Sequence, residues 1–180
     1  MIDYERILKK YAEGNPELYR ILEGHSRAVA DKALAIAARK PELGIDTEFV
    51  EEAAMLHDVG IVRCDAPSIA CHGTHPYICH GILGGEILRD EGLPRHARVA
   101  ERHTGAGITA ADIERQNLPL PKQDWLPESL EEKLICYADK FYSKSRDLRA
   151  EKLIEKIKAQ MAAHGDDTLR RFLSLHAIFL

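Results

Sequence analysis

Hydrophobic residues recur about every 3.6 positions along nearly the whole chain, and no stretch alternates apolar and polar residues for long. This period predicts helices, and turn-forming residues divide the pattern into segments. Asn15-Pro16 is typical of a helix start, and Ser129 and Glu132 have the spacing of a capping box. We expect Gly24 to bend or interrupt the second helix just before His25. The predicted helices cover residues 4–13, 16–40, 47–57, 80–90, 94–103, 129–145, 150–164 and 166–179.

The pattern therefore predicts an all-α bundle of about eight helices. Residues 59–78 and 116–127 contain prolines and polar clusters that are typical of loops. The sequence contains no internal repeat and no low-complexity segment. We expect one domain over residues 1–145, with residues 146–180 forming a C-terminal helical extension packed on it.

Several histidines and one aspartate lie on the apolar faces of these helices. His25, His80 and His103 share their faces with aliphatic residues, and Asp139 interrupts an apolar run. A carboxylate on such a face is costly unless another group neutralises it. Any one of these residues could be an ordinary core residue bonded to a carbonyl or to a basic side chain. Five inward positions on five helices, His57 included, instead favour a shared metal ion at the centre of the bundle.

His57 and Asp58 are adjacent, at the predicted end of an apolar helix. Adjacent helical side chains diverge by about 100°, so two adjacent ligands work only where the helix ends and the backbone turns. We expect Gly60 to supply the backbone freedom for that turn, and Gly84-Gly85 to let another backbone approach closely.

Composition narrows the function classes. The chain has 180 residues, nine of them histidines, and six of these lie between His57 and His103. The net charge of −4 and the lack of a dense Lys/Arg tract argue against a nucleic-acid-binding module. Four cysteines without a Cys-x-x-Cys motif favour reduced thiols. We find neither a signal-peptide pattern nor an apolar run long enough to span a membrane, so we expect a cytoplasmic protein.

The candidate ligands match a known pattern. The chain resembles the HD domain superfamily of metal-dependent phosphohydrolases on the H…HD…D signature formed by His25, His57-Asp58 and Asp139. His57-Asp58-Val59-Gly60 is similar to the HDIG variant, and Ala138-Asp139-Lys140 to the final element of the signature. Histidines in CHGILGGEIL and ERHTGAGIT resemble the subset that holds two metals. The resemblance covers about residues 20–145 and extends to small archaeal and bacterial HDIG proteins and to the HD-type dinucleoside-tetraphosphate hydrolases.

The resemblance implies a ligand set. His25, His57, Asp58 and Asp139 would hold one divalent metal, and Asp58 would bridge to a second metal completed by His80 and His103. Nitrogen and oxygen ligands without a thiolate fit Fe or Mn best, with Zn, Mg or Ni as alternatives. Whether one or two ions bind stays open at this point.

The resemblance also implies hydrolysis of a nucleotide or another small phosphoester or phosphoanhydride by a metal-activated water. Asp58 is the candidate bridging residue, and Lys140 is the candidate cation beside the transferring phosphate. His75, in the loop over 63–78, is a candidate general acid. An accessory zinc site and a flexible polar loop are the alternative interpretations of this loop.

Two other functions use the same fold. Some HD proteins, similar to myo-inositol oxygenase, are diiron oxygenases, and an HD domain can also act as a ligand-binding module without catalysis. We expect a small phosphorylated partner, no nucleic acid and no membrane. Residues 146–180 lie outside the resemblance and are candidates for capping the site, for forming a homodimer or for completing the core.

Overall fold

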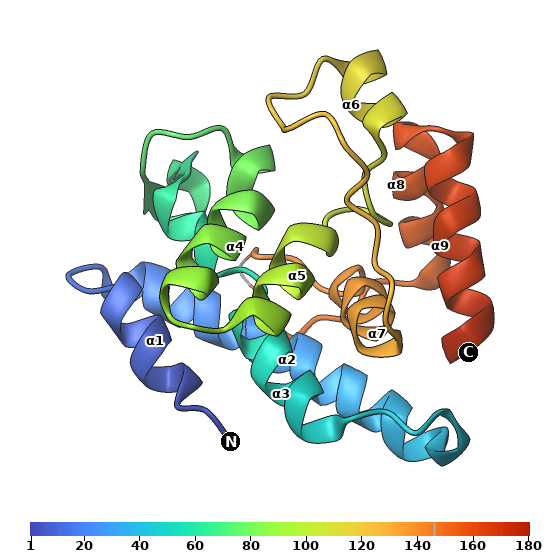
Figure 1. The fold of residues 1–180 in the computed structure, drawn as a ribbon, viewed down its shortest axis with the longest axis horizontal. Coiled ribbons are helices and arrows are strands. Elements are labelled where there is room, and N and C mark those ends of the chain that lie inside the picture. The colour runs from blue at the N-terminus through green and yellow to red at the C-terminus, as the bar shows by residue number, and fades with distance from the viewer. Residues whose placement is uncertain (146) are drawn as a thin grey trace.

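The computed structural model of the chain describes residues 1–145 and 147–180, and its fold is almost entirely helical (Figure 1). The described residues form α1 (Tyr4–Tyr11), α2 (Pro16–Arg39), α3 (Thr47–Leu56), α4 (His80–Asp90), α5 (Pro94–Arg102), α6 (Ala110–Gln116), α7 (Leu130–Asp139), α8 (Ile154–His164) and α9 (Asp166–Phe179). The predicted all-α class is confirmed, with nine helices in place of about eight.

The segment between α3 and α4 is more ordered than the predicted loop. It contains four short elements: η2 (Val59–Arg63), β1 (Asp65–Ala66), η3 (Pro67–Ile69) and β2 (Cys71–His72), and it ends in η4 (Tyr77–Cys79). A further turn, η1 (Pro41–Leu43), precedes α3. β1 and β2 form a small antiparallel sheet in which Asp65 pairs with His72 and Ala66 with Cys71.

The helix starts follow the signals in the sequence. The Asn15 side chain accepts a hydrogen bond from the Leu18 amide at 3.0 Å, so it caps α2 as predicted. The Ser129 hydroxyl accepts one from the Glu132 amide at 3.1 Å at the start of α7. The Glu132 carboxylate bonds to the Glu128 amide instead of closing the box on Ser129, so only half of the predicted capping box forms.

Two predictions about the helices are wrong because of packing between distant segments, and α8 also begins at Ile154 instead of residue 150. Gly24 does not interrupt α2; a Cβ there would lie 2.7 Å from Leu148 Cδ1, so this glycine gives Leu148 room against the helix. α7 ends at Asp139 and does not continue to residue 145. The Phe141 carbonyl accepts a hydrogen bond from the Lys152 amide at 2.7 Å, which holds the chain beyond α7 in a turn.

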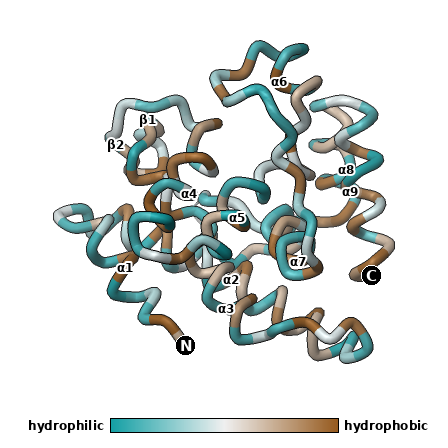
Figure 2. Tube along the Cα trace, viewed as in Figure 1, coloured by the Kyte–Doolittle hydropathy of each residue, from teal (hydrophilic) through white to brown (hydrophobic). Residues whose placement is uncertain are grey.

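The core lies between the long helix α2 and the helices that cross it. α2 packs against α3 and α7, α4 packs along α5, and the α8–α9 pair packs on α7 through α9. The tube in Figure 2 shows apolar positions concentrated where these helices face one another. Buried residues at the centre include Leu22, Val29, Leu56, Ile87, Leu134 and Ile135.

Gly60 is required for a close approach between two backbones. A Cβ on Gly60 would lie 2.0 Å from the His80 carbonyl oxygen and 2.4 Å from the Gly84 amide nitrogen. Its φ is not among the positive values of the chain, so the expectation that Gly60 serves for backbone freedom is wrong. Gly84 faces Gly60 from α4, as the expected close approach requires. The two glycines therefore set the position of α4 relative to His57 and Asp58.

Across the residues that the structure describes, no helix combines the length and the apolar character needed to cross a membrane.

Gly60→Ala is predicted to destabilise the fold strongly, because its new methyl group meets backbone atoms that cannot rotate away. We expect a loss of about 3 kcal/mol or more in the free energy of unfolding, measured by urea denaturation in the presence of a chelator. Gly24→Ala is the matched control, since its methyl meets only the end of the flexible Leu148 side chain. Equal denaturation midpoints for Gly60→Ala and the wild type would contradict the close approach.

Candidate metal centre

The six residues that the sequence singles out as ligands come from five parts of the fold and meet at one point. His25 lies in the middle of α2, His57 and Asp58 follow α3, His80 begins α4, His103 follows α5, and Asp139 ends α7. All six are buried. They form two groups that could each hold a metal ion, and Asp58 belongs to both.

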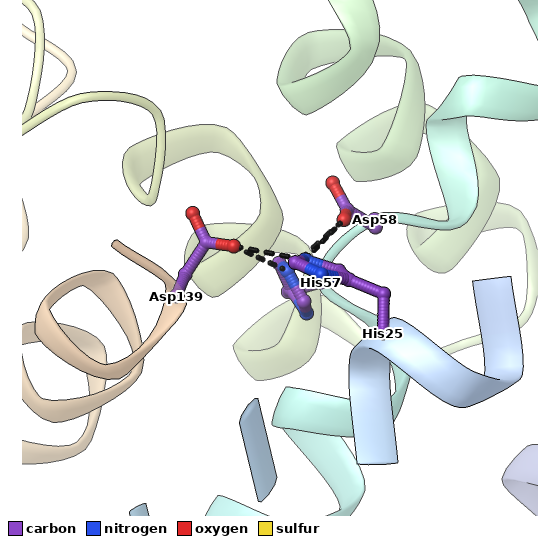
Figure 3. Close-up of side chains that lie close together, drawn as sticks. All are labelled: His25, His57, Asp58 and Asp139. Carbon is purple, nitrogen blue, oxygen red and sulfur yellow. Dashed lines mark hydrogen bonds and ion pairs between the residues drawn. The ribbon is translucent and has the colours of Figure 1, made fainter. Parts of the chain in front are cut away.

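The first group consists of His25, His57, Asp58 and Asp139 (Figure 3). His25 Nε2 lies 3.0 Å from Asp139 Oδ1 and 3.2 Å from Asp58 Oδ2. His57 Nε2 lies 3.2 Å from the same Asp58 oxygen and 3.5 Å from Asp139 Oδ1. The two imidazoles thus lie between two carboxylates, each of which turns one oxygen toward both rings.

The second group uses the other oxygen of Asp58. Asp58 Oδ1 lies 3.5 Å from His80 Nε2 and 3.4 Å from His103 Nε2, and the two nitrogens are 3.0 Å apart. One carboxylate therefore directs one oxygen to each group, which is the arrangement of a ligand that bridges two ions.

Three of the imidazoles are held in one orientation by the backbone. The Nδ1 atoms of His57, His80 and His103 lie 2.6 Å, 2.7 Å and 2.7 Å from the carbonyl oxygens three residues earlier. Each Nδ1 donates its proton to that carbonyl, so each ring turns Nε2 toward the centre, where this nitrogen offers a lone pair whenever the imidazole is neutral. His57 and His103 lie directly after helices, where the last carbonyls have no partner within the helix.

The centre has the properties of a metal site. His57 Nε2 and Asp58 Oδ1 are buried and have no hydrogen-bond partner among the described residues. The facing nitrogens of His80 and His103 both carry lone pairs if both Nδ1 atoms donate, and such a pair is repulsive unless a cation lies near it. Imidazole and carboxylate ligands without a thiolate suit Fe, Mn or Zn. The residues present therefore fit a divalent metal.

The protonation states of Asp58 and His80 agree with this interpretation, whereas that of His57 opposes metal binding. Burial opposes ionisation of Asp58, but His57 and Lys144 outweigh it and hold the pKa of Asp58 well below its usual value. Burial and the neighbouring His103 lower the pKa of His80 to about 3. Burial lowers the pKa of His57 as well, yet Asp58 and Asp139 outweigh it and raise that pKa to about 9. An ionised carboxylate and a neutral His80 are the forms that bind a metal, whereas at His57 a proton competes with it.

The two other candidate catalytic residues, Lys140 and His75, lie outside the two ligand groups. The Lys140 ammonium lies 2.6 Å from Asp139 Oδ2 and donates to the His103 carbonyl at 3.1 Å, so it fixes a ligand and the end of α5. His75 is exposed in the segment before α4, and its side chain belongs to neither ligand group. Arg63, earlier in the same segment, pairs with Glu86 at 3.0 Å.

Two residues at the centre were not predicted from the sequence. Lys144 Nζ lies 2.6 Å from Asp58 Oδ2, and the Tyr77 ring stacks on His80 with 4.7 Å between ring centroids. In a helix running to residue 145, Lys144 would point about 140° away from Asp139. Because α7 ends at Asp139, the chain folds back and brings Lys144 to Asp58. Tyr77 lies in a segment whose pattern indicates only a loop.

The HD domain family matches residues 22–143 of the chain, which include all six candidate ligands. The chain therefore belongs to the HD domain family. It is 34% identical over 152 residues to "Uncharacterized protein MJ0778" of Methanocaldococcus jannaschii, a match that covers 83% of this chain and 82% of that protein.

Two further relatives are each named tRNA (cytidine(56)-2′-O)-methyltransferase. The one from Picrophilus torridus is 38% identical over 112 residues, covering 62% of this chain and 29% of the relative. The one from Thermoplasma volcanium is 28% identical over 156 residues, covering 86% of this chain and 40% of the relative. The chain thus spans less than half the length of either methyltransferase. No solved structure matches the chain significantly.

Asp58→Ala is predicted to remove bound metal entirely, because both ligand groups share this carboxylate. Metal content per chain, measured by elemental analysis after reconstitution with Mn and desalting, should fall to background. Asp65→Ala, a change at an exposed aspartate outside both groups, is the control and should retain the wild-type content. Unchanged metal in Asp58→Ala would reject the shared-ligand assignment.

His103→Ala is predicted to lose only the metal held by Asp58, His80 and His103, leaving the first group occupied. The expected result is about half of the wild-type Mn per chain at saturation. His96→Ala is the matched control, because His96 is also a buried histidine of α5 but pairs with Glu52 at 3.1 Å, outside the centre.

The control should lower stability by about 1–3 kcal/mol and leave metal content alone. A wild type that binds one ion, with His103→Ala binding the same amount, would show that the second group holds no metal.

Proposed function

We propose that this chain is a metal-dependent phosphohydrolase that cleaves a nucleotide or another small phosphoester or phosphoanhydride. The observation that carries the proposal is the division of the Asp58 oxygens between two buried ligand groups. Two divalent ions held by these residues would supply an activated water and would neutralise the charge of a phosphate. The chain belongs to the HD domain family, and its H…HD…D signature resembles that of metal-dependent phosphohydrolases. Both observations support the same reaction class.

The chain contributes preorganisation to this chemistry. The carbonyl-bonded imidazoles of His57, His80 and His103 cannot turn away from the centre without breaking a buried hydrogen bond. Lys140 restrains the Asp139 side chain by donating a hydrogen bond from its ammonium to Asp139 Oδ2. Ligands that are fixed in advance need no reorganisation during the reaction. Such preorganisation is the main source of electrostatic stabilisation in enzymes.

A small phosphorylated molecule fits the surface charges better than a nucleic acid does. The arginines of α5 that could form a basic stripe are already paired: Arg98 contacts Glu132 at 2.8 Å, and Arg95 contacts Asp46 at 3.7 Å. The methyl transfer in the names of two relatives is not carried over to this chain, because the match covers only 29% and 40% of those proteins.

A diiron oxygenase is the second candidate, since iron also accepts this mixture of imidazole and carboxylate ligands. Oxygenation needs iron that changes its oxidation state and needs dioxygen, whereas hydrolysis needs neither. The two functions therefore differ in their requirement for metal and gas rather than in their ligands.

The proposal predicts that protein stripped of metal and reloaded with Mn alone hydrolyses members of a panel of mono-, di- and cyclic nucleotides and simple phosphoesters under anaerobic conditions. Release of inorganic phosphate, or of a new phosphomonoester from diesters, is the measurement. Asp58→Ala should reduce the rate by several orders of magnitude. Activity that appears only with Fe and dioxygen would favour the oxygenase and contradict the proposal.

A further inference from the structure

A cavity of about 720 Å³ lies beside the metal centre and shares two residues with it. It is bounded by the first turns of α2, by residues 66–69, by Tyr77 and by residues 143–145. Tyr77 stacks on His80, and Lys144 lies 2.6 Å from Asp58 Oδ2, so both residues connect the cavity wall to the ligands. A cavity of this size is in the usual range for small-molecule sites.

Lys144 is the group at which the cavity and the centre meet. Its side chain is 12% exposed, and its ammonium is paired with Asp58, which has no exposed surface. Burying an ammonium is costly, so a lysine placed here needs an anion beside it at all times. Lys140 cannot take the same role, because its ammonium is held by Asp139 and by the His103 carbonyl.

The backbone that carries Lys144 is anchored rather than left free. The Lys152 ammonium donates to the Tyr142 carbonyl at 2.9 Å, and the Lys152 amide donates to the Phe141 carbonyl at 2.7 Å. These contacts fix the turn after α7, which places residue 144 at the mouth of the centre.

Charge balance indicates what Lys144 binds. Two carboxylates, Asp58 and Asp139, face two ammonium groups, Lys140 and Lys144, so these four side chains are neutral together. Each divalent ion bound by the ligands adds two positive charges to this buried region. Asp58 would then be shared with these cations, which would leave Lys144 able to pair with another anion that reaches it through the cavity that this lysine lines.

We infer that Lys144 binds the phosphoryl group of the substrate and that the cavity holds the organic group attached to that phosphate. The inference rests on the proposed function for its substrate class. Ile21, Ile69 and Tyr77 provide an apolar and aromatic wall for the organic group, and Ser68 lines the same space. The cavity therefore selects phosphoesters with a bulky organic group over inorganic phosphate.

The first test measures phosphate binding directly and without turnover. Inorganic phosphate and phenylphosphonate, which cannot be hydrolysed, are titrated calorimetrically into Mn-loaded protein. Lys144→Met should keep the wild-type Mn content and bind both probes about tenfold or more weakly, because it lacks one charge-assisted hydrogen bond. Lys144→Arg, which keeps the positive charge, should bind inorganic phosphate within about threefold of the wild type. Lys122→Met, at an exposed lysine, is the control and should bind as the wild type does.

The second test separates the cavity from the phosphate site. Ser68→Trp fills the cavity with an indole and should weaken phenylphosphonate binding about tenfold while inorganic phosphate binds as before. Ser174→Trp, on the exposed surface of α9, is the matched control and should change neither affinity.

Two results would overturn the inference. One is phosphate binding by Lys144→Met equal to that of the wild type; the other is loss of Mn in this variant, which would make Lys144 a support of the ligands only. Failure of the proposed function looks different, since a protein without phosphoester hydrolysis would still show the Lys144-dependent binding of both probes.

Discussion

The fold is organised around the burial of one carboxylate. Asp58 has no exposed surface, and isolating an ionised carboxylate from water costs several kcal/mol unless charges of opposite sign surround it. Four histidines on four different segments direct Nε2 toward its two oxygens, and Lys144 approaches one of them. Since these side chains come from α2, α4, the ends of α3 and α5, and the turn after α7, the centre constrains how these helices pack. A cation bound between the two ligand groups would compensate the burial at both oxygens at once.

The ends of helices fix the orientation of two of the histidine side chains at the centre. A histidine just after a helix finds a carbonyl of the last turn that accepts its Nδ1 proton, and the opposite nitrogen then points away from the helix. His57 and His103 both use this arrangement. The close contact of Gly60 with α4 places the start of that helix, and hence His80, within reach of Asp58. The glycine of the HD-x-G motif thus allows two backbones to approach closely, and it affects the site indirectly, through the position of α4.

Much of this could be predicted from the sequence, because the information is local. The helical period exposes His25, His80, His103 and Asp139 as polar residues on apolar faces, and the caps at Asn15 and Ser129 mark helix starts. What local pattern cannot give is where a helix ends when distant segments decide it. Lys144 meets Asp58 only because α7 ends at Asp139, with the following turn held by hydrogen bonds from residue 152.

The same limit explains the other differences from the prediction. α6 has a complete capping box at Thr109 and Asp112, but its short length gives too few periodic positions to be distinguished from a loop. Gly24 acts within α2 through contact with Leu148, more than a hundred residues away along the chain. Tyr77 gains its role from stacking on His80, which depends on the turn of η4. For Gly24 and Tyr77 the missing information is a tertiary contact, and intrinsic propensity is too weak to replace it.

The two lysines that follow α7 make different contacts at the centre, and the proposed function gives them different roles. Lys140 is bonded to a ligand and to the His103 carbonyl, so both of its strong contacts belong to the protein framework. Lys144 has its ion pair on the bridging carboxylate and its remaining surface on the cavity. If both lysines were paired only with ligands, the buried centre would contain cations but no side-chain donor that could contact an entering phosphate. If both faced the cavity, Asp139 would lose the partner that orients it. Under the proposed function, one lysine of each kind, four residues apart on a turn anchored by Lys152, would let the ligands stay rigid while a separate cation binds the phosphoryl group.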